Sequence, residues 1–258
     1  MTSNFRIATW NVGRPTKNCA RNSCLLDHIH HVGADIWILT ETNHVINPGP
    51  EFWGLSTPAS TWGKPGERAA TIWSRFPISS AIVTFADGTD ENLPPVGPTY
   101  AIRGPATSPA ICTVIETPIG PLLVHGTIIT WLNDKGPRDT SDFGREHCAS
   151  IESHHRDWLR LAENKIACVA GDFNVIFNGY RYGEREKLQY ALDAIDLVCL
   201  TNPLADLVDH ICLSRAWSGL VVKSSRWDSP LFNGELLSPG HPAATSIDLP
   251  RNLPTSHS

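Results

Sequence analysis

Short apolar runs alternate with stretches of helical spacing along the chain, which predicts a protein of mixed strands and helices. Strands are predicted over residues 5–11, 36–39, 69–73, 79–85, 111–116, 122–129, 166–170, 198–201, 209–214, 220–223 and 243–249. Helices are predicted where apolar residues recur every three or four positions, over residues 22–32, 141–163 and 184–197. Two stretches rich in Pro and other turn residues, 43–66 and 86–109, are predicted to be connections.

The composition is that of a folded domain. Of 258 residues, 41% are hydrophobic and 18% are charged, which allows a substantial core and excludes a disordered or collagen-like chain. We expect one domain over residues 1–250 and a frayed tail over residues 251–258. No apolar run approaches the roughly 20 residues that span a bilayer, and no apolar leader is present, so we expect a cytoplasmic protein without a membrane span.

Charge and cysteine content narrow the classes of partner. Lys and Arg number 21 against 26 Asp and Glu, a net charge of −5, so no overall positive field gathers polyanions. This argues against tight, sequence-independent binding of nucleic acid but allows a local basic rim. The seven cysteines form no C-x-x-C pair and four lie in apolar runs, so we expect reduced thiols that pack as small apolar side chains.

Polar side chains suited to a cation or a phosphate stand at the ends or starts of several predicted strands. Mg²⁺ prefers oxygen ligands and keeps several waters, so one or two carboxylates and an amide suffice when a phosphate supplies the rest. Gly171 lets the backbone beside Asp172 turn sharply and pass close to a ligand. The pattern predicts an oxygen-rich site rather than a zinc site. Its residues are Asn11, Glu41, Asp172, Asn174, Asp209 and, much later, His241.

Taken singly, these residues have simpler explanations. Asn11, and Asp172 with Asn174, are ordinary turn formers after a strand. Glu41 is an acid that a loop can expose to solvent, and His241 precedes a proline in a loop. The functional hypothesis therefore depends on their joint, ordered appearance at strand ends.

The sequence around these positions resembles the endonuclease/exonuclease/phosphatase family of Mg²⁺-dependent phosphoesterases. Five blocks match the family pattern in order and spread over nearly the whole chain, whereas a lone Gly-Asp-Phe-Asn would be weak evidence. The blocks are residues 7–12 (IATWNV), 34–42 (ADIWILTET), 71–78 (TIWSRFPI), 170–174 (AGDFN) and 208–214 (VDHICLS). The resemblance implies an α+β fold, a four-layer αββα sandwich of two facing mixed β-sheets with outer helices.

The resemblance also implies how the site holds its metal. Glu41 would bind Mg²⁺ directly, with Mn²⁺ as a substitute, and Asn11 would contact the water shell of the metal or the phosphate. Arg75 is a candidate substrate contact through the phosphate, with pairing to a nearby acid as the alternative.

Four further residues carry the catalytic roles that the resemblance implies. Asp172 and Asn174 would orient the attacking water and a phosphoryl oxygen. His241 would contact the scissile phosphate, held in orientation by Asp209. Either Asp172 or His241 could take the proton of the water, and Asp172 is favoured because an imidazolium is the better partner for a charged phosphate.

Two departures from the family pattern affect the interpretation. The closing motif is usually Ser-Asp-His, and here it is Pro239-Gly240-His241, so the carboxylate before the histidine is absent. The absence implies one of three outcomes: weaker Mg²⁺ binding, catalysis shifted onto Glu41 and Asp172, or an impaired member that binds a phosphorylated ligand without cleaving it. Many members also carry a His or Tyr near the end of the strand over residues 122–130, where His125 is the available residue and its register is early.

The resemblance implies a Mg²⁺-dependent phosphodiester hydrolase that uses in-line attack by an activated water, and a nuclease is the favoured activity. The partner would be nucleic acid or another phosphodiester, and a monomer is expected. Phosphatase and phospholipid-headgroup phosphodiesterase activities are the alternatives within the same chemistry.

Overall fold

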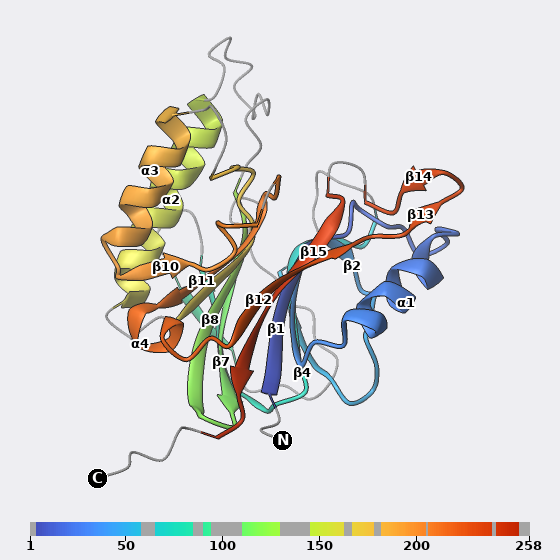
Figure 1. The fold of residues 1–258 in the computed structure, drawn as a ribbon, viewed down its shortest axis with the longest axis horizontal. Coiled ribbons are helices and arrows are strands. Elements are labelled where there is room, and N and C mark those ends of the chain that lie inside the picture. The colour runs from blue at the N-terminus through green and yellow to red at the C-terminus, as the bar shows by residue number, and fades with distance from the viewer. Residues whose placement is uncertain are drawn as a thin grey trace.

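Two β-sheets pack face to face, and helices cover their outer faces (Figure 1). The structure is a computed structural model that describes residues 4–57, 65–84, 90–93, 110–129, 145–162, 167–177, 182–204, 206–238 and 241–252. The predicted four-layer αββα fold is confirmed by this arrangement. Within the described ranges, no helix is both long and apolar enough to cross a membrane.

Sheet A has six described strands in the order β12-β15-β1-β2-β4-β3. It is mixed, because β1 runs parallel to β2 and the other neighbours are antiparallel. Its strands are β1 (Asn4–Asn11), β2 (Ile36–Asn43), β3 (Trp53–Ser56), β4 (Glu67–Ser74), β12 (Lys223–Asp228) and β15 (Ala243–Pro250). A small hairpin of β13 (Leu231–Phe232) and β14 (Glu235–Leu236) lies between β12 and β15 in the sequence.

Sheet B has seven described strands in the order β10-β11-β9-β8-β7-β5-β6. It is also mixed, with β8 parallel to β9 and the other neighbours antiparallel. Its strands are β5 (Ile78–Thr84), β6 (Asp90–Leu93), β7 (Ile111–Thr117), β8 (Gly120–Ile128), β9 (Cys168–Asp172), β10 (Leu197–Cys199) and β11 (Asp209–Ser214).

Four helices are described. Leu25, Ile29 and Val32 of α1 (Asn22–Val32) pack on the outer face of sheet A. Helices α2 (Arg145–Ala162) and α3 (Tyr182–Asp193) pack on the outer face of sheet B through an apolar cluster that includes Trp158 and Leu188. The fourth helix, α4 (Arg215–Ser218), is a single turn after β11.

The main core lies between the two sheets. It joins apolar side chains of sheet A, such as Ile38 and Ile72, to side chains of sheet B, such as Val124 and Ile211, and all four are fully buried. Alternate residues of a strand point to opposite faces, so each central strand also supplies side chains to its helix layer. Because both faces are covered, the strands are apolar on both sides, and polar residues concentrate at their ends.

The prediction of a strand over residues 220–223 is wrong. The chain forms α4 and then a turn, and the next strand, β12, begins at Lys223 and runs to Asp228. Leu220 and Val221, which suggested the strand, pack against the inter-sheet core from that turn. β12 is an edge strand with a mostly polar sequence, a composition that gives little periodic signal.

Element boundaries account for the other differences. The predicted connections contain the short strands β3 and β6. α3 ends at Asp193, earlier than predicted, because the chain turns at Asp196, with φ 57°, and Leu197 enters β10. α2 begins at Arg145, and residues 141–144 and 163 of the predicted helix lie outside the described residues.

Two neutral histidines are built into the layer between sheet B and α2. The Trp158 indole donates a hydrogen bond to His125 Nδ1 at 3.2 Å, and His154 Nδ1 donates to the Ser150 carbonyl at 2.7 Å. Burial and the charges of His154 and Arg160 lower the pKa of His125 to about 3. Burial also lowers the pKa of His154 to about 4, although its bond to Ser150 opposes the shift.

We therefore expect the protein to lose stability in acid. Above pH 6.5 both histidines are neutral in the folded and in the unfolded protein. Below pH 6.5 they take up protons in the unfolded chain, whereas in the folded protein His154 is protonated only near pH 4 and His125 only near pH 3. The free energy of unfolding should fall between pH 6.5 and 4 by about 1.4 kcal/mol per pH unit for each histidine. Urea unfolding at several pH values measures this slope.

His154→Gln should flatten the slope, while His30→Gln, a change at an exposed position of α1, should leave it as it was. Equal slopes in all three proteins would show that the buried histidines are not responsible.

Candidate functional site

One edge of the sandwich collects the strand-end residues. Asn11 ends β1 and lies beside Thr40 of the parallel strand β2. Asp172 ends β9 and lies directly opposite Asp209, the first residue of β11. His241 precedes β15, whose Thr245 pairs with Thr9 of β1, so the histidine reaches the same edge. The two sheets thus bring Asn11, Asp172, Asp209 and His241 together.

The turn after β9 depends on a glycine and on a buried phenylalanine. Gly171 has φ 143°, and a β-carbon there would overlap the Thr127 carbonyl oxygen of the neighbouring strand. Phe173 is fully buried against Trp158 and His210 on the helix side of sheet B. Asn174 follows in the left-handed region, with φ 52°. This sequence of conformations returns the Asn174 side chain to Asp172.

Asp172 is the most heavily bonded group of the site. Its Oδ2 accepts hydrogen bonds from Asn11 Nδ2 at 2.8 Å and Asn174 Nδ2 at 3.2 Å, and its Oδ1 accepts one from the Asn174 backbone at 2.9 Å. Burial and the charge of Asp209 raise the pKa of Asp172 to about 7, against the lowering effects of His241, Asn11 and Asn174. The carboxyl can therefore exchange a proton near neutral pH.

His241 and Asp209 form an ion pair beside Asp172. His241 Nδ1 lies 2.9 Å from Asp209 Oδ2, and His241 Nε2 lies 3.8 Å from Asp172 Oδ2. Burial lowers the pKa of His241, but Asp209, by charge and hydrogen bond, and then the charges of Asp172 and Glu41 outweigh it and raise that pKa to about 9. The Trp10 indole also donates to the His241 carbonyl at 3.2 Å. The imidazole is thus held as a cation.

Glu41 lies at the end of β2 in a strained conformation. Its φ is 46°, between the regular pairs Thr40 with Ala70 and Thr42 with Arg68. Arg14, itself at φ 57°, donates from Nη2 to Glu41 Oε1 at 2.9 Å, and its backbone N–H donates to the Glu41 carbonyl at 2.7 Å. The carboxylate that the sequence predicts as a metal ligand is thus paired with a guanidinium.

Sequence reasoning missed Arg14 and its second partner, Glu67. Arg14 Nε lies 3.3 Å from Glu67 Oε1, and Glu67 is nearly buried whereas the Arg14 side chain is half exposed. The available signal was the position of Arg14 three residues after Asn11, in a loop that Gly13 turns with φ 65°. Arg14 therefore lies at the same edge of the sandwich as the strand-end residues, beside Glu41.

The donor set fits a hard divalent cation. One atom each from Asp172, Asp209 and His241 lies within 4.8 Å of the others, and the two carboxylates, rather than the protonated imidazole, are the donors that a cation can use. Asp209 Oδ1 is buried and has no hydrogen-bond partner, which is costly for a carboxylate unless a further positive group or a water meets it. Glu41 and the side-chain oxygen of Asn11 add oxygen donors at the same edge, and oxygen is the donor that Mg²⁺ and Mn²⁺ prefer.

Arg75 does not reach this cluster. It follows β4 at the opposite end from Glu41, because Ser74 pairs with Ile36 at the start of β2. Its guanidinium lies 3.8 Å from Asp35 and 3.6 Å from Glu51, and its carbon centre lies 4.9 Å from the Phe52 ring centroid. The structure thus favours the alternative, pairing with nearby acids, over a contact with the substrate at this site.

Two other predicted positions lie away from the cluster or outside the described residues. His125 faces α2 and is fully buried beside Trp158, so the early register noted in the sequence places it behind sheet B. Gly240, which stands where the family has an aspartate, lies outside the described residues.

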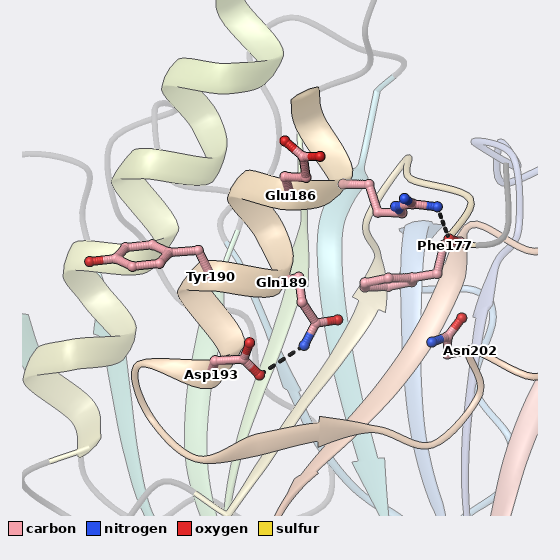
Figure 2. Close-up of a pocket in the computed structure, with 7 residues that line it drawn as sticks. Phe177, Glu186, Gln189, Tyr190, Asp193 and Asn202 are labelled. Atoms are coloured by element: carbon pink, nitrogen blue, oxygen red, sulfur yellow. Dashed lines mark hydrogen bonds between the residues drawn. The ribbon is translucent and has the colours of Figure 1, made fainter. Parts of the chain in front are cut away.

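A separate pocket of about 460 Å³ lies beside α3 (Figure 2). The Phe177 ring at its wall meets His210 at a centroid distance of 4.8 Å, and His210 faces the helix side of β11 whereas Asp209 faces the other side. The pocket therefore does not contain the carboxylate cluster. Its lining residues are Phe177, Arg185, Glu186, Gln189, Tyr190, Asp193 and Asn202.

Comparison with known families agrees with the geometry. The model of the endonuclease/exonuclease/phosphatase family matches residues 8–230, which is most of the chain. The chain belongs to the endonuclease/exonuclease/phosphatase family. Members of this family are hydrolases that act on phosphoester bonds and generally depend on a divalent metal. No curated protein matches the sequence.

Solved structures of the same fold cover nearly the whole chain. A 3′ phosphatase, NExo, from Neisseria, solved with a product DNA hairpin, is 14% identical with a TM-score of 0.65, over 95% of this chain and 99% of that one. The AP endonuclease LMAP from Leishmania major is 13% identical with a TM-score of 0.64, over 96% and 88%. Sphingomyelinase C from Streptomyces griseocarneus is 16% identical with a TM-score of 0.57, over 96% and 100%. At these identities the likeness shows the fold.

The ion pair of His241 gives a prediction for the metal-free protein. Asp209→Asn removes the negative charge 2.9 Å from the imidazole, so the pKa of His241 should fall from about 9 by about one unit or more. An NMR titration of the histidine ring protons measures this value. Asp196→Asn removes an exposed carboxylate that lies just before β10, near the end of β11 opposite to Asp209, and should leave the pKa of His241 unchanged. An unchanged pKa in Asp209→Asn would refute the assignment.

Proposed function

We propose that this protein is a divalent-metal-dependent phosphodiesterase, and specifically a nuclease, with Mg²⁺ as the metal and Mn²⁺ as a substitute. The observation that supports it best is the buried network of Asp172, Asp209 and His241, which places a titratable carboxyl beside an imidazolium. In-line phosphoryl transfer needs a group that takes a proton from water and fixed donors that meet the negative charge of the phosphate.

In the proposed reaction, Asp172 takes the proton of the attacking water. Its carboxylate is held by Asn11 and Asn174, and a pKa near 7 suits a base that works at neutral pH. His241, kept cationic by Asp209, stabilises the charge that develops on the phosphoryl oxygens. Glu41 and the Asn11 oxygen would hold the divalent cation, which when bound neutralises the growing negative charge.

The proposed substrate is nucleic acid. Two of the three similar structures are an AP endonuclease and a 3′ phosphatase with a product DNA hairpin, and the third is a sphingomyelinase. The net charge of −5 disfavours tight, sequence-independent binding to duplexes, so a single strand or a short phosphodiester is the better fit. The sequence-based expectations of a cytoplasmic location and a monomer stay predictions.

The proposed roles give a prediction for turnover of bis-p-nitrophenyl phosphate. We expect hydrolysis with Mg²⁺ or Mn²⁺ and none with EDTA. Asp172→Asn should lower kcat by about 100-fold or more, because it removes the group that accepts the proton. Asp196→Asn is the matched control, since it makes the same change at an exposed carboxylate, and it should keep full activity.

A panel of single-stranded DNA, duplex DNA, RNA, nucleotides and sphingomyelin then identifies the substrate class. Cleavage of internal phosphodiesters supports the nuclease, whereas release of phosphate from nucleotides alone, or cleavage of the lipid headgroup alone, would replace it by one of the other two activities. A folded protein with no turnover under either metal would favour the impaired member that the Gly240 departure suggests.

The Arg14–Glu41 ion pair gives a prediction about metal affinity. The guanidinium occupies the carboxylate that would bind the cation, so Arg14→Gln should tighten Mn²⁺ binding by about two- to fivefold, the range expected for loss of an exposed ion pair. Isothermal titration calorimetry with Mn²⁺ measures it. Lys17→Gln removes the same charge from an exposed position nearby and should have little effect. Weaker Mn²⁺ binding by Arg14→Gln would contradict competition between the Arg14 guanidinium and the metal for Glu41.

A further inference from the structure

Two cysteines lie opposite each other on neighbouring strands of sheet B. Cys199 ends the edge strand β10, and its register partner on β11 is Cys212. The Leu200 backbone N–H donates to the Ile211 carbonyl at 2.9 Å, so the two cysteines form a pair that does not itself exchange backbone hydrogen bonds. In such pairs the Cα atoms lie about 4.5 Å apart, within the range of about 4.4–6.8 Å that a disulfide requires.

The two thiols point to the same side of the sheet and contact each other. Cys212 belongs to the apolar cluster under α2 and α3, and Cys199 packs at its margin. The two thiols are close enough for each to shift the pKa of the other. Cys212 is buried, whereas Cys199, on the edge strand, is partly exposed as a residue, so Cys199 is the cysteine of the pair that lies nearer to solvent.

Cys199 faces polar neighbours on its side of the sheet. Its Sγ lies 3.8 Å from Thr201 Oγ1, which is 3.1 Å from His210 Nδ1. Burial raises the pKa of Cys199, but the neighbouring Cys212 and polar side chains outweigh it and bring that pKa below its usual value. The thiolate is the form that attacks oxidants.

Cys168 on the adjacent strand β9 shows the opposite environment. It is fully buried in the inter-sheet core, on the other face of sheet B from Cys212, and burial raises its pKa to about 12. Its register partner is Leu213. The environment of a cysteine in this sheet therefore depends on which face of the sheet it occupies.

We propose that Cys199 and Cys212 are a reversible oxidation site that closes into a disulfide between β10 and β11 on reaction with hydrogen peroxide. The Cys199 thiolate attacks one peroxide oxygen, the O–O bond breaks, and the products are a sulfenic acid and a hydroxide ion that takes a proton to become water. Cys212 then attacks the Cys199 sulfur, its thiol proton leaves with the hydroxyl as a second water, and the S–S bond forms. Both sulfurs are oxidised and the peroxide is reduced. The inference is independent of the proposed phosphoesterase activity.

Oxidation would link the edge strand covalently to β11, the strand that begins with Asp209, the partner of His241. In β11, Asp209 is followed by His210, whose Nδ1 forms a hydrogen bond with Thr201 Oγ1. His210 Nε2 donates a hydrogen bond to the carbonyl of Val175, the residue after Asn174. A covalent link between β10 and β11 therefore acts on residues that support the site.

Peptide mapping of the full chain tests the proposal. The protein is treated with equimolar hydrogen peroxide, alkylated with iodoacetamide and digested without reductant by a protease that cleaves before aspartate, since Asp206 and Asp209 separate the two cysteines. We expect a peptide pair linked through Cys199 and Cys212 as the main oxidation product, and dithiothreitol should remove it. Cys148→Ser, a change at another partly buried cysteine, should give the same product.

A second variant separates the two steps. Cys212→Ala keeps a small apolar side chain in the core and removes the second sulfur, so Cys199 should stop at a sulfenic acid that dimedone labels at least fivefold more strongly than in the unchanged chain. Overturning results would be oxidation at other cysteines before Cys199, links only between molecules, or equal dimedone labelling with and without Cys212.

Discussion

The hydrogen bond from the Asn11 amide to the Asp172 carboxylate joins the two sheets where the proposed chemistry occurs. Both side chains are buried, one at the end of β1 and the other at the end of β9. A buried carboxylate is costly unless donors surround it, and Asn11 supplies one of them from the opposite sheet. The protonation of Asp172 therefore depends on how the two sheets pack against each other. Any shift of one sheet against the other would change the proton affinity of the base.

The same edge carries backbone strain. Glu41, Arg14 and Asn174 all adopt positive φ without being glycine, a conformation that costs of order 1–3 kcal/mol at each such residue. The inter-sheet core and both helix layers hold these residues in place. Strain at Glu41 within the otherwise regular strand β2, and at Asn174 just after β9, agrees with a preorganised site for a cation and a phosphate.

Much of this arrangement could be predicted from the sequence because strand ends have clear signals. Apolar runs that stop at Asn11, Asp172 or before Asp209 place those residues at strand ends. The family pattern then implies that the two sheets face each other and bring these strand ends to one edge of the sandwich. Contacts that depend on side-chain reach could not be predicted. Arg14 folds back onto Glu41, and Arg75 pairs at the far end of β4, yet both look alike as cations near a strand end. The polar edge strand β12 has no apolar periodicity, which is why the strand was placed too early.

The pairing of β1 with β15 has a consequence for synthesis of the chain. Asn4 lies opposite Pro250, so the central strand β1 can pair with its neighbour β15 only after more than 230 further residues have been translated. His241 arrives with that same last strand, after every other member of the cluster. A growing chain would thus carry both acids before it carries the imidazole, so the cluster of Asp172, Asp209 and His241 forms only after β15 has been synthesised and inserted.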